Sequence, residues 1–202
     1  YSVSNQKSWA NPYYNNNKIM EILNKYGCTS KSFIGLKLDN PQIMGVLNIT
    51  PDSFSNDNKK IISTNNAVKQ AITMMEEGAN IIDIGGESSR PGAKRINSIE
   101  EQKRIIPVIK ELTKYNIPIS CDTRNASTME LAIDAGASII NDISALSDKK
   151  AAYVIAKNNV GLIIMHMKGQ PNNMQNNPKY RNVSYEVLSF LNKKNSMLLR
   201  KV

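Results

Sequence analysis

The sequence predicts an α/β protein in which βα units repeat along the chain and their strands form a parallel sheet. From residue 41 onward, five short runs of apolar and β-branched residues each precede a helical pattern. Nearly continuous apolar runs are typical of parallel strands, because such strands are buried on both faces. The chain also contains an internal repeat: residues 78–84 read GANIIDI and residues 136–143 read GASIINDI. Repeated units of this kind are typical of a barrel.

The predicted strands cover residues 43–49, 80–84, 117–121, 138–143 and 160–166. Between the first two strands, Thr64 is expected to cap a helix that ends at Gly78. Ser98 and Glu101 are expected to form a capping box at the start of the next helix. Pro107 is expected to break or restart that helix.

Three further helices are expected, one after Asn125 that stops at Gly136, one after Asp148, and one from Ser184 to the end of the chain. Residues 1–40 are polar and Asn-rich, with one helix predicted at 17–25 and irregular structure elsewhere. We interpret residues 1–40 as a linker or as the remnant of an upstream domain, and 41–202 as one incomplete domain.

Two architectures fit five βα units. Each unit takes about 32 residues, so eight units would need roughly 260, close to the ~250 residues of a (β/α)8 barrel. The chain stops three units short of that number. A five-stranded, doubly wound sheet would fit the length without truncation, and the periodicity of the sequence does not separate the two.

Composition excludes several classes of partner. The 202 residues carry 26 Lys and Arg against 17 Asp and Glu, a formal net charge of +9. The basic residues are spread along the chain and aromatic residues make up only 6% of it, so no nucleic-acid partner is expected. No apolar run approaches the roughly 18 residues of a membrane span, and the N-terminus has no apolar signal core. We therefore expect a cytoplasmic protein with no membrane partner.

The residues that bind transition metals are scarce. Cys28 and Cys121 lie far apart and form no C-x-x-C pair, and His166 is the only histidine. We therefore expect neither a zinc site nor a disulfide framework. His166 is interpreted as a packed, satisfied imidazole rather than as a catalytic base.

Polar side chains follow the predicted strands, where parallel βα folds bind their ligands. Asp122 could accept two parallel N–H bonds from the 2-amino-4-oxo edge of a pterin or guanine, or could simply cap a helix. Asn141 offers a donor beside an acceptor, which suits a heterocycle as well as a turn. Asn48 could give a neutral oxygen to Mg²⁺ or an N–H to phosphate, although such a residue is also common in turns.

The loop after the second strand is rich in Gly and Ser and contains Arg90 beside Pro91. Arg90 is a candidate clamp for a phosphate or carboxylate, and the alternative is a solvated loop arginine. Glu87, next to two glycines, is interpreted as a structural carboxylate that accepts hydrogen bonds from loop N–H groups.

Five motifs in this order resemble the dihydropteroate synthase family over residues 41–202. They are LNITPDSFS at 47–55, DIGGESSRPGA at 83–93, ISCDT at 119–123, IINDI at 139–143 and MHMKG at 165–169. The resemblance implies the (β/α)8 TIM barrel fold, of which the chain holds the first five βα units. It also implies folate biosynthesis: p-aminobenzoate is joined to a 6-hydroxymethyl-dihydropterin pyrophosphate, and pyrophosphate is released with Mg²⁺. Sulfonamides target this family.

The resemblance also assigns site residues. Asn48 matches the family's metal and pyrophosphate residue, and Asp122 and Asn141 match its ligands for the pterin edge. Met165 matches a residue that packs on the pterin, and Phe54 a first-loop aromatic near p-aminobenzoate. The second loop contributes Ser89, Arg90 and Pro91.

The sequence departs from the family pattern in two places. The first loop reads NDNKK at 56–60, where the family usually has Asp-Gly-Gly, and the family's later motifs, which include a lysine and pyrophosphate ligands, are absent. We therefore expect this chain alone to lack synthase activity and to expose sheet edges. A homodimer is implied for the full-length enzyme. Two other readings stay open: the pterin-binding domain of a corrinoid-dependent methyltransferase, and a non-catalytic remnant of a decayed synthase gene.

Overall fold

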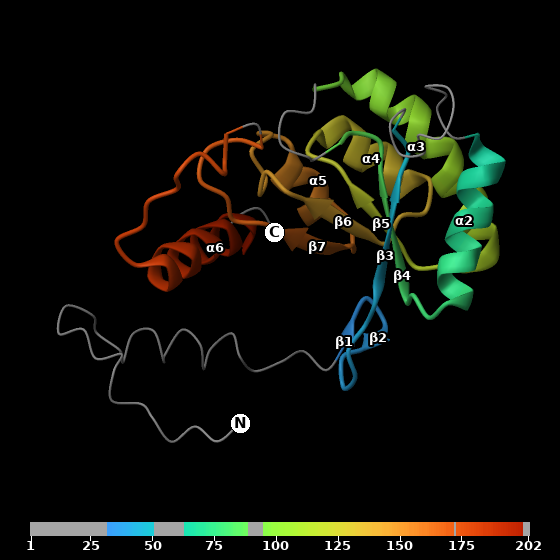
Figure 1. Ribbon diagram of the computed structural model, residues 1–202, viewed down its shortest axis with the longest axis horizontal. Helices are drawn as coiled ribbons and strands as arrows, with labels where there is room; N and C mark the ends of the chain where they lie inside the picture. The colour runs from blue at the N-terminus through green and yellow to red at the C-terminus, as the bar shows by residue number, and fades with distance from the viewer. Residues whose placement is uncertain (1–31, 51–62, 89–94, 172, 200–202) are drawn as a thin grey trace.

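The computed structural model describes residues 32–50, 63–88, 95–171 and 173–199 (Figure 1). Its strands are β1 (Ser32–Phe33), β2 (Leu36–Lys37), β3 (Met44–Asn48), β4 (Ile81–Gly85), β5 (Ile119–Asp122), β6 (Ile139–Asp142) and β7 (Gly161–Ile164). Its helices are α2 (Thr64–Glu76), α3 (Ser98–Leu112), α4 (Ala126–Asp134), α5 (Ala151–Lys157) and α6 (Val183–Leu199), with a short 3-10 turn at Thr113–Tyr115. The predicted helix at 17–25 lies outside the described residues.

The five predicted strands of the βα units form one parallel sheet in the order β3-β4-β5-β6-β7. Spatial order therefore follows chain order, without the reversal that defines a doubly wound sheet. The helices of successive units pack side by side, α2 against α3, α3 against α4 and α4 against α5, as an outer layer around the curved sheet (Figure 1). This arrangement is that of five consecutive units of a (β/α)8 barrel, which decides between the two architectures that the sequence left open.

The apolar core lies between the sheet and this helix layer. One row of register partners crosses the sheet and faces the helices: Leu47, Ile84, Cys121, Ile140 and Leu162. The helices supply the other side of the core, for example with Ile105, Val108 and Met129, each at most 1% exposed. Because side chains alternate between the two faces of a strand, the next residue of each strand faces the opposite, concave side.

Two helix starts differ from prediction by one residue. The α2 cap is Ser63, whose Oγ accepts from Asn66 N, and not Thr64. The α3 cap is Asn97, whose Oδ1 accepts from Glu100 N at 2.8 Å, so the predicted capping box of Ser98 with Glu101 is wrong. Adjacent residues with capping oxygens compete at both places, and the sequence does not show which of them precedes the first helical residue.

Pro107 lies inside a continuous α3, so the prediction that it breaks this helix is wrong. A proline in a helix removes one backbone hydrogen bond and costs about 3 kcal/mol. Around Pro107, however, Ile105, Ile109 and Leu112 are fully buried against the sheet. Burying each such side chain contributes about 1.5–3 kcal/mol, so tertiary packing outweighs the local cost.

Both copies of the repeat begin in the same way. Gly78 and Gly136 follow the last turns of α2 and α4, each with φ +109°, a left-handed conformation that favours glycine. The predicted helix ends at these two glycines are therefore confirmed.

The structure adds a hairpin in the segment predicted to be irregular. Strands β1 and β2 pair antiparallel, Phe33 with Leu36, around the two-residue turn Ile34–Gly35. Both turn residues have positive φ, 49° and 79°, as a tight hairpin turn requires. The hairpin packs on the start of β7, where a Cβ on Gly161 would lie 2.6 Å from the Phe33 ring. Only a glycine allows this close approach.

Among the described residues, no helix is long and apolar enough to cross a membrane. The helix predicted from Ser184 is confirmed over Val183–Leu199, and the last three residues of that prediction lie outside the described residues. His166 lies just after β7, half-buried, with its ring edge-on to Phe190 of α6 at 4.9 Å and tilted against Tyr180 at 5.9 Å. These contacts agree with the interpretation of His166 as a packed imidazole.

Candidate active site

One row of register partners runs along the carboxyl ends of the strands on the concave face. It consists of Asn48, Gly85, Asp122, Asn141 and Ile163, one residue from each of the five strands. The three polar residues are those that the sequence analysis proposed as ligands, and the register brings them to one edge of the sheet. Their placement follows from strand length, because each strand ends at or just beyond this row.

Asp122 carries the one carboxyl of this row, and its pKa is strongly shifted. Burial raises its pKa from an ordinary value near 3.8 to about 7, and the negative charges of Asp83, Glu101, Asp142 and Glu87 add to the effect. Such a carboxyl changes charge near neutral pH. Strongly shifted carboxyl pKa values are concentrated at functional sites, so the position of Asp122 at the end of a strand makes it a candidate ligand of the site.

Asn141 is fixed by a second carboxylate. Its Nδ2 donates to Asp83 Oδ2 at 3.0 Å, a contact that links β6 to β4 across the intervening strand β5. Asp83 is 5% exposed in the middle of β4, a strand whose five residues are all buried. Burial raises the Asp83 pKa above its ordinary value, and the neighbouring Ser120 and Asn141 side chains partly counter this.

Asn48 ends β3 and is half-buried. Gly85 separates it from Asp122: a Cβ on Gly85 would lie 3.4 Å from both Asn48 Oδ1 and Asp122 Oδ2. The glycine therefore leaves the two side-chain oxygens facing a common space. A neutral oxygen at the edge of this space suits a hard cation such as Mg²⁺, which takes oxygen ligands and keeps several from water or phosphate. No cluster of three or more His, Cys, Asp or Glu side chains that could hold a metal occurs among the described residues.

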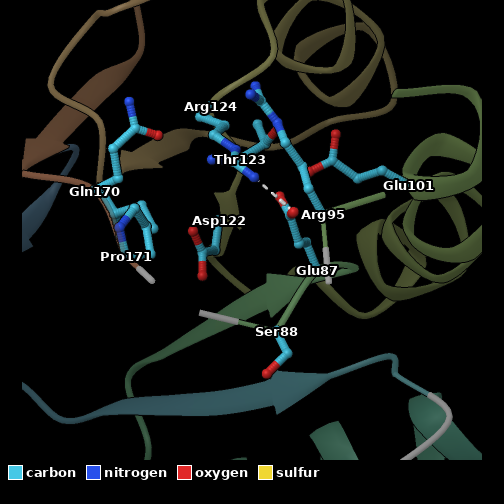
Figure 2. A pocket seen from close by; sticks show the side chains of 10 residues that line it. Glu87, Ser88, Arg95, Glu101, Asp122, Thr123, Arg124, Gln170 and Pro171 are labelled. Carbon is cyan, nitrogen blue, oxygen red and sulfur yellow. Dashed lines mark hydrogen bonds and ion pairs between the residues drawn. The ribbon is translucent and has the colours of Figure 1, made fainter. Parts of the chain in front are cut away.

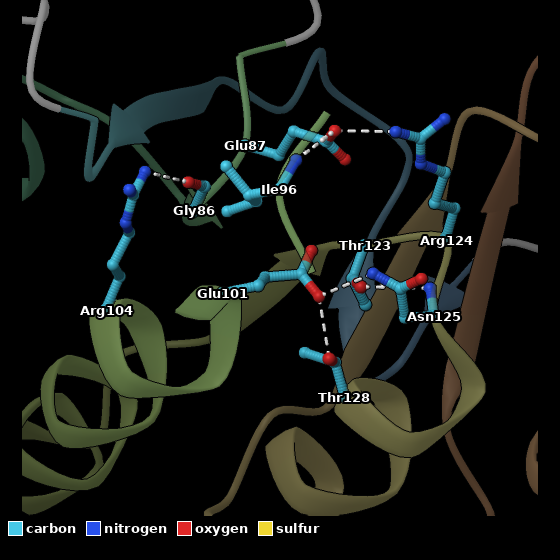
Figure 3. A network of polar contacts seen from close by, with 9 residues as sticks. All are labelled: Gly86, Glu87, Ile96, Glu101, Arg104, Thr123, Arg124, Asn125 and Thr128. Carbon is cyan, nitrogen blue, oxygen red and sulfur yellow. Dashed lines mark hydrogen bonds and ion pairs between the residues drawn. The ribbon is translucent and has the colours of Figure 1, made fainter. Parts of the chain in front are cut away.

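Glu87 and Arg124 form an ion pair at the rim of the site. Their 2.6 Å contact lies between side chains only 15% and 14% exposed, and Glu87 Oε1 also accepts from Ile96 N at 3.2 Å. The pair ties the segment after β4 to the segment after β5 (Figure 3). Glu87 thus acts as the structural carboxylate that the sequence analysis expected.

Below this rim, Glu101 of α3 forms a second network (Figure 3). Its carboxylate is 1% exposed and accepts from Asn125 Nδ2 at 2.9 Å and from Thr128 Oγ1 at 2.6 Å. Glu101 therefore ties α3 to the start of α4, directly behind Asp122. The sequence analysis assigned Glu101 to a cap, because nothing local in the chain reveals a partner 24 residues away.

Of the register row, only Asp122 lines the pocket of about 200 Å³ at the carboxyl ends of β4 and β5, together with Glu87, Glu101 and Arg124. Figure 2 shows the Asp122 carboxylate between Gln170 and Pro171 on one side and Glu87 and Ser88 on the other. An adjoining pocket of about 220 Å³ is lined by Met165 beyond β7, together with Ile143 and Phe190. Met165 thus lies near the site, in the adjoining pocket rather than beside Asp122.

Four predicted site residues, Phe54, Ser89, Arg90 and Pro91, lie outside the described residues.

The sequence analysis missed one residue that the structure brings into the site. Asp83 was quoted only as part of a motif, although it is the one charged residue in an otherwise apolar or glycine strand. That break in an apolar run is the signal that could have identified it.

Comparison with known proteins agrees with the geometry. A family model described as "Pterin binding enzyme" matches residues 44–201. The dihydropteroate synthase of Haemophilus influenzae is 46% identical over 165 residues, 81% of this chain and 60% of that protein. The dihydropteroate synthase of Bacillus subtilis is 51% identical over 132 residues, 64% of this chain and 46% of that protein.

Solved structures give the same result. The Yersinia pestis dihydropteroate synthase, solved with a sulfonamide drug complex, matches with a TM-score of 0.77 at 38% identity, over 84% of this chain and 62% of that one. The Burkholderia cenocepacia dihydropteroate synthase, complexed with 7,8-dihydropteroate, matches with a TM-score of 0.72 at 36% identity, over 82% and 56%. The chain therefore spans between 46% and 62% of the length of these relatives.

Proposed function

This chain belongs to the family of pterin binding enzymes, and we propose from that premise that it supplies the pterin side of a dihydropteroate synthase site. The reaction would join p-aminobenzoate to 6-hydroxymethyl-dihydropterin pyrophosphate and release pyrophosphate. The observation that carries the proposal is the register row that places Asn48, Asp122 and Asn141 on one edge of the sheet. The matched relatives are dihydropteroate synthases, which favours this reaction over corrinoid methyl transfer.

The pterin ring is held at its hydrogen-bonding edge. An ionised Asp122 accepts two parallel N–H bonds from the 2-amino-4-oxo side of the ring, and Asn141 contributes a donor and an acceptor beside it. Because Asp122 is half-buried among other side chains, each of these bonds forms where an unpaired donor is costly. Met165 and the adjoining pocket are proposed to pack against the ring.

Transfer needs no covalent bond to the protein. The C–O bond between the hydroxymethyl carbon and the pyrophosphate breaks, and its electron pair leaves with the pyrophosphate. The amine of p-aminobenzoate then attacks the carbon and loses a proton. An ionised Asp122 on the ring side stabilises the positive charge that spreads over the pterin as the leaving group departs.

Asn48 is proposed to hold Mg²⁺ through its Oδ1, with the remaining ligands coming from pyrophosphate and water. The ion, when bound, neutralises the charge that builds on the leaving group. From the resemblance, Arg90 is proposed to clamp an anionic group, with Ser89 and Pro91 beside it in the second loop. Phe54 of the first loop is proposed to lie near p-aminobenzoate.

The test is calorimetric titration of 6-hydroxymethyl-dihydropterin pyrophosphate into the chain, with Mg²⁺ present. Asp122→Ala should weaken binding about 100-fold, because ring donors lose their partner in a buried site. Asp134→Ala is the matched control, since Asp134 is an exposed aspartate at the end of α4. An unchanged affinity for Asp122→Ala would remove the assignment, and a wild-type chain that binds no pterin would contradict the proposed function.

A further inference from the structure

The structure contains two buried aspartates, one in β4 and one in β6, which differ in how their oxygens are used. Asp142 of β6 accepts three hydrogen bonds, from Ser144 N, Ser144 Oγ and Leu146 N, at 2.6–2.8 Å. It is a saturated structural carboxylate that shapes the loop after β6. Asp83 of β4 is 5% exposed, yet its Oδ1 has no hydrogen-bond partner among the described residues. A role in loop structure therefore explains Asp142 but does not explain Asp83.

The contact that Asp83 does make is with a proposed ligand of the pterin. Asn141 Nδ2 donates to Asp83 Oδ2 at 3.0 Å, and both side chains lie on the concave face. Ser120, the register partner of Asp83, lies beside it with a buried hydroxyl that lowers the Asp83 pKa. Burying a carboxylate in the middle of an apolar strand destabilises the fold, so its presence here indicates a use in the site.

An ionised carboxylate only accepts hydrogen bonds, which fixes how the Asn141 amide lies. The Nδ2 group must face Asp83, because a flip of the amide by 180° would set its carbonyl oxygen against the carboxylate. Asn141 therefore presents one N–H and its carbonyl to the ligand in a fixed order. The order matters, because a ring with the opposite sequence of donor and acceptor cannot pair with it.

We infer that Asp83 is a positioning residue that holds the Asn141 amide in one orientation and thereby selects 2-amino pteridines over 2-oxo pteridines. In a pterin, the edge at N1 and C2 carries an acceptor followed by the donor amino group. In lumazine, the 2,4-dioxo analogue, the same edge carries the N1–H donor followed by an acceptor oxygen. A fixed amide matches only the first order, whereas a free amide can turn and match either. This inference rests on the proposed function, since it takes the ring to be a pteridine.

The experiment compares the affinities of pterin and lumazine for the wild type, Asp83→Ala, Asp83→Asn and the control Asp134→Ala. Because burial raises the Asp83 pKa and the inference needs the ionised carboxylate, the affinities are measured at several pH values from about 7.5 upward. In Asp83→Ala the preference for pterin should fall about tenfold, because the freed amide can now accept lumazine. Asp83→Asn retains an acceptor oxygen and the side-chain shape. Its preference for pterin should therefore lie between that of the wild type and that of Asp83→Ala. Asp134→Ala should keep the wild-type preference.

A second measurement needs no ligand. In the wild type, the Asn141 side-chain amide should show one N–H that exchanges slowly with solvent, and Asp83→Ala should raise that exchange rate about tenfold or more. Equal exchange rates in the two proteins would overturn the inference. So would an Asp83→Ala variant that loses affinity for both rings equally, which is the result of a merely structural role.

The outcomes can still be distinguished if a variant does not fold or if the wild type binds neither ring. Where Asp83→Ala does not fold, an unchanged preference in Asp83→Asn overturns the inference. Where the wild type binds neither ring, the proposed function and the ring selection both fall, while the exchange measurement still decides whether Asp83 holds Asn141.

Discussion

Two adjacent rows of residues cross the same five strands and differ in polarity and in the face of the sheet on which they lie. The row of Leu47, Ile84, Cys121, Ile140 and Leu162 faces the helices and is wholly apolar apart from one thiol. Burial raises the pKa of that Cys121 thiol well above its ordinary value, so it stays neutral in the core. The next row, one residue further along each strand, carries the polar groups of the site. Moving by a single residue therefore exchanges a surface that stabilises the fold for one that carries the proposed pterin ligands.

The comparison predicts that stability depends mainly on the helix-facing row. Leu47 is 1% exposed in the core, so Leu47→Ala should lower the free energy of unfolding by about 3 kcal/mol. Urea denaturation followed by circular dichroism measures this loss. A loss below about 1 kcal/mol would show that the site of Leu47 collapses without cost and would weaken the distinction between the rows.

A polar residue of the helix layer, Glu101, is expected to stabilise the fold rather than to bind the ligand. Its buried carboxylate lies in the helix layer, and Glu101→Ala would leave Asn125 and Thr128 without their acceptor. We expect a loss of about 2 kcal/mol in the free energy of unfolding. Glu100→Ala, which removes a half-exposed carboxylate one residue earlier, should change it by less than about 1 kcal/mol. Equal losses in the two variants would contradict the structural role of Glu101.

The raised pKa of Asp122 predicts that stability and pterin binding change in opposite directions with pH. The folded chain keeps a proton on Asp122 that the unfolded chain releases between the ordinary value near 3.8 and about 7, so this group makes stability fall as pH rises through that window. Pterin binding needs the ionised form, so affinity should fall about tenfold for each pH unit below 7. Titration calorimetry and thermal unfolding at several pH values measure the two trends. Asp122→Asn should flatten both, and an affinity that rises on acidification would contradict the assignment.

The smallest change in the free energy of unfolding is expected at Val46, the residue adjacent to Leu47, where the largest is expected. Val46 precedes Leu47 in β3, points to the concave face and is 56% exposed. Val46→Ala should therefore change the free energy of unfolding by about 0.5 kcal/mol or less, as exposed positions usually do. The same denaturation experiment measures it. A loss as large as that of Leu47→Ala would mean that the concave face is packed, contrary to the exposure of Val46.

The sequence allowed the sheet and the polar row to be predicted, because both rest on local patterns. Apolar runs locate the strands, and Asn48, Asp122 and Asn141 each stand at the end of one. Pairings over long distances in the chain were not predicted: the Asp83 contact with Asn141 joins residues 58 apart, and no local signal links them.

Local competition explains the other misses. Ser63 and Thr64 both carry capping oxygens, and the choice between them depends on where the chain enters the helix. The β1–β2 hairpin has Ile34 at a turn position that usually takes Asn, Asp or Gly, so its sequence lacks the usual turn signal. Its packing against Gly161, more than 120 residues away, is what holds it in place.

The register row also determines which kinds of mutation the site tolerates. Each polar residue of the row stands on its own strand, so a substitution in one βα unit changes one contact and leaves the others in place. An insertion or deletion of one residue within a strand is different, because it turns every following side chain of that strand to the other face. One such change in β5 before Cys121 would move the Asp122 carboxyl into the helix-facing core and Cys121 into the site. Insertions and deletions in the loops between strands leave this alternation untouched, so length variation in this fold should be confined to them.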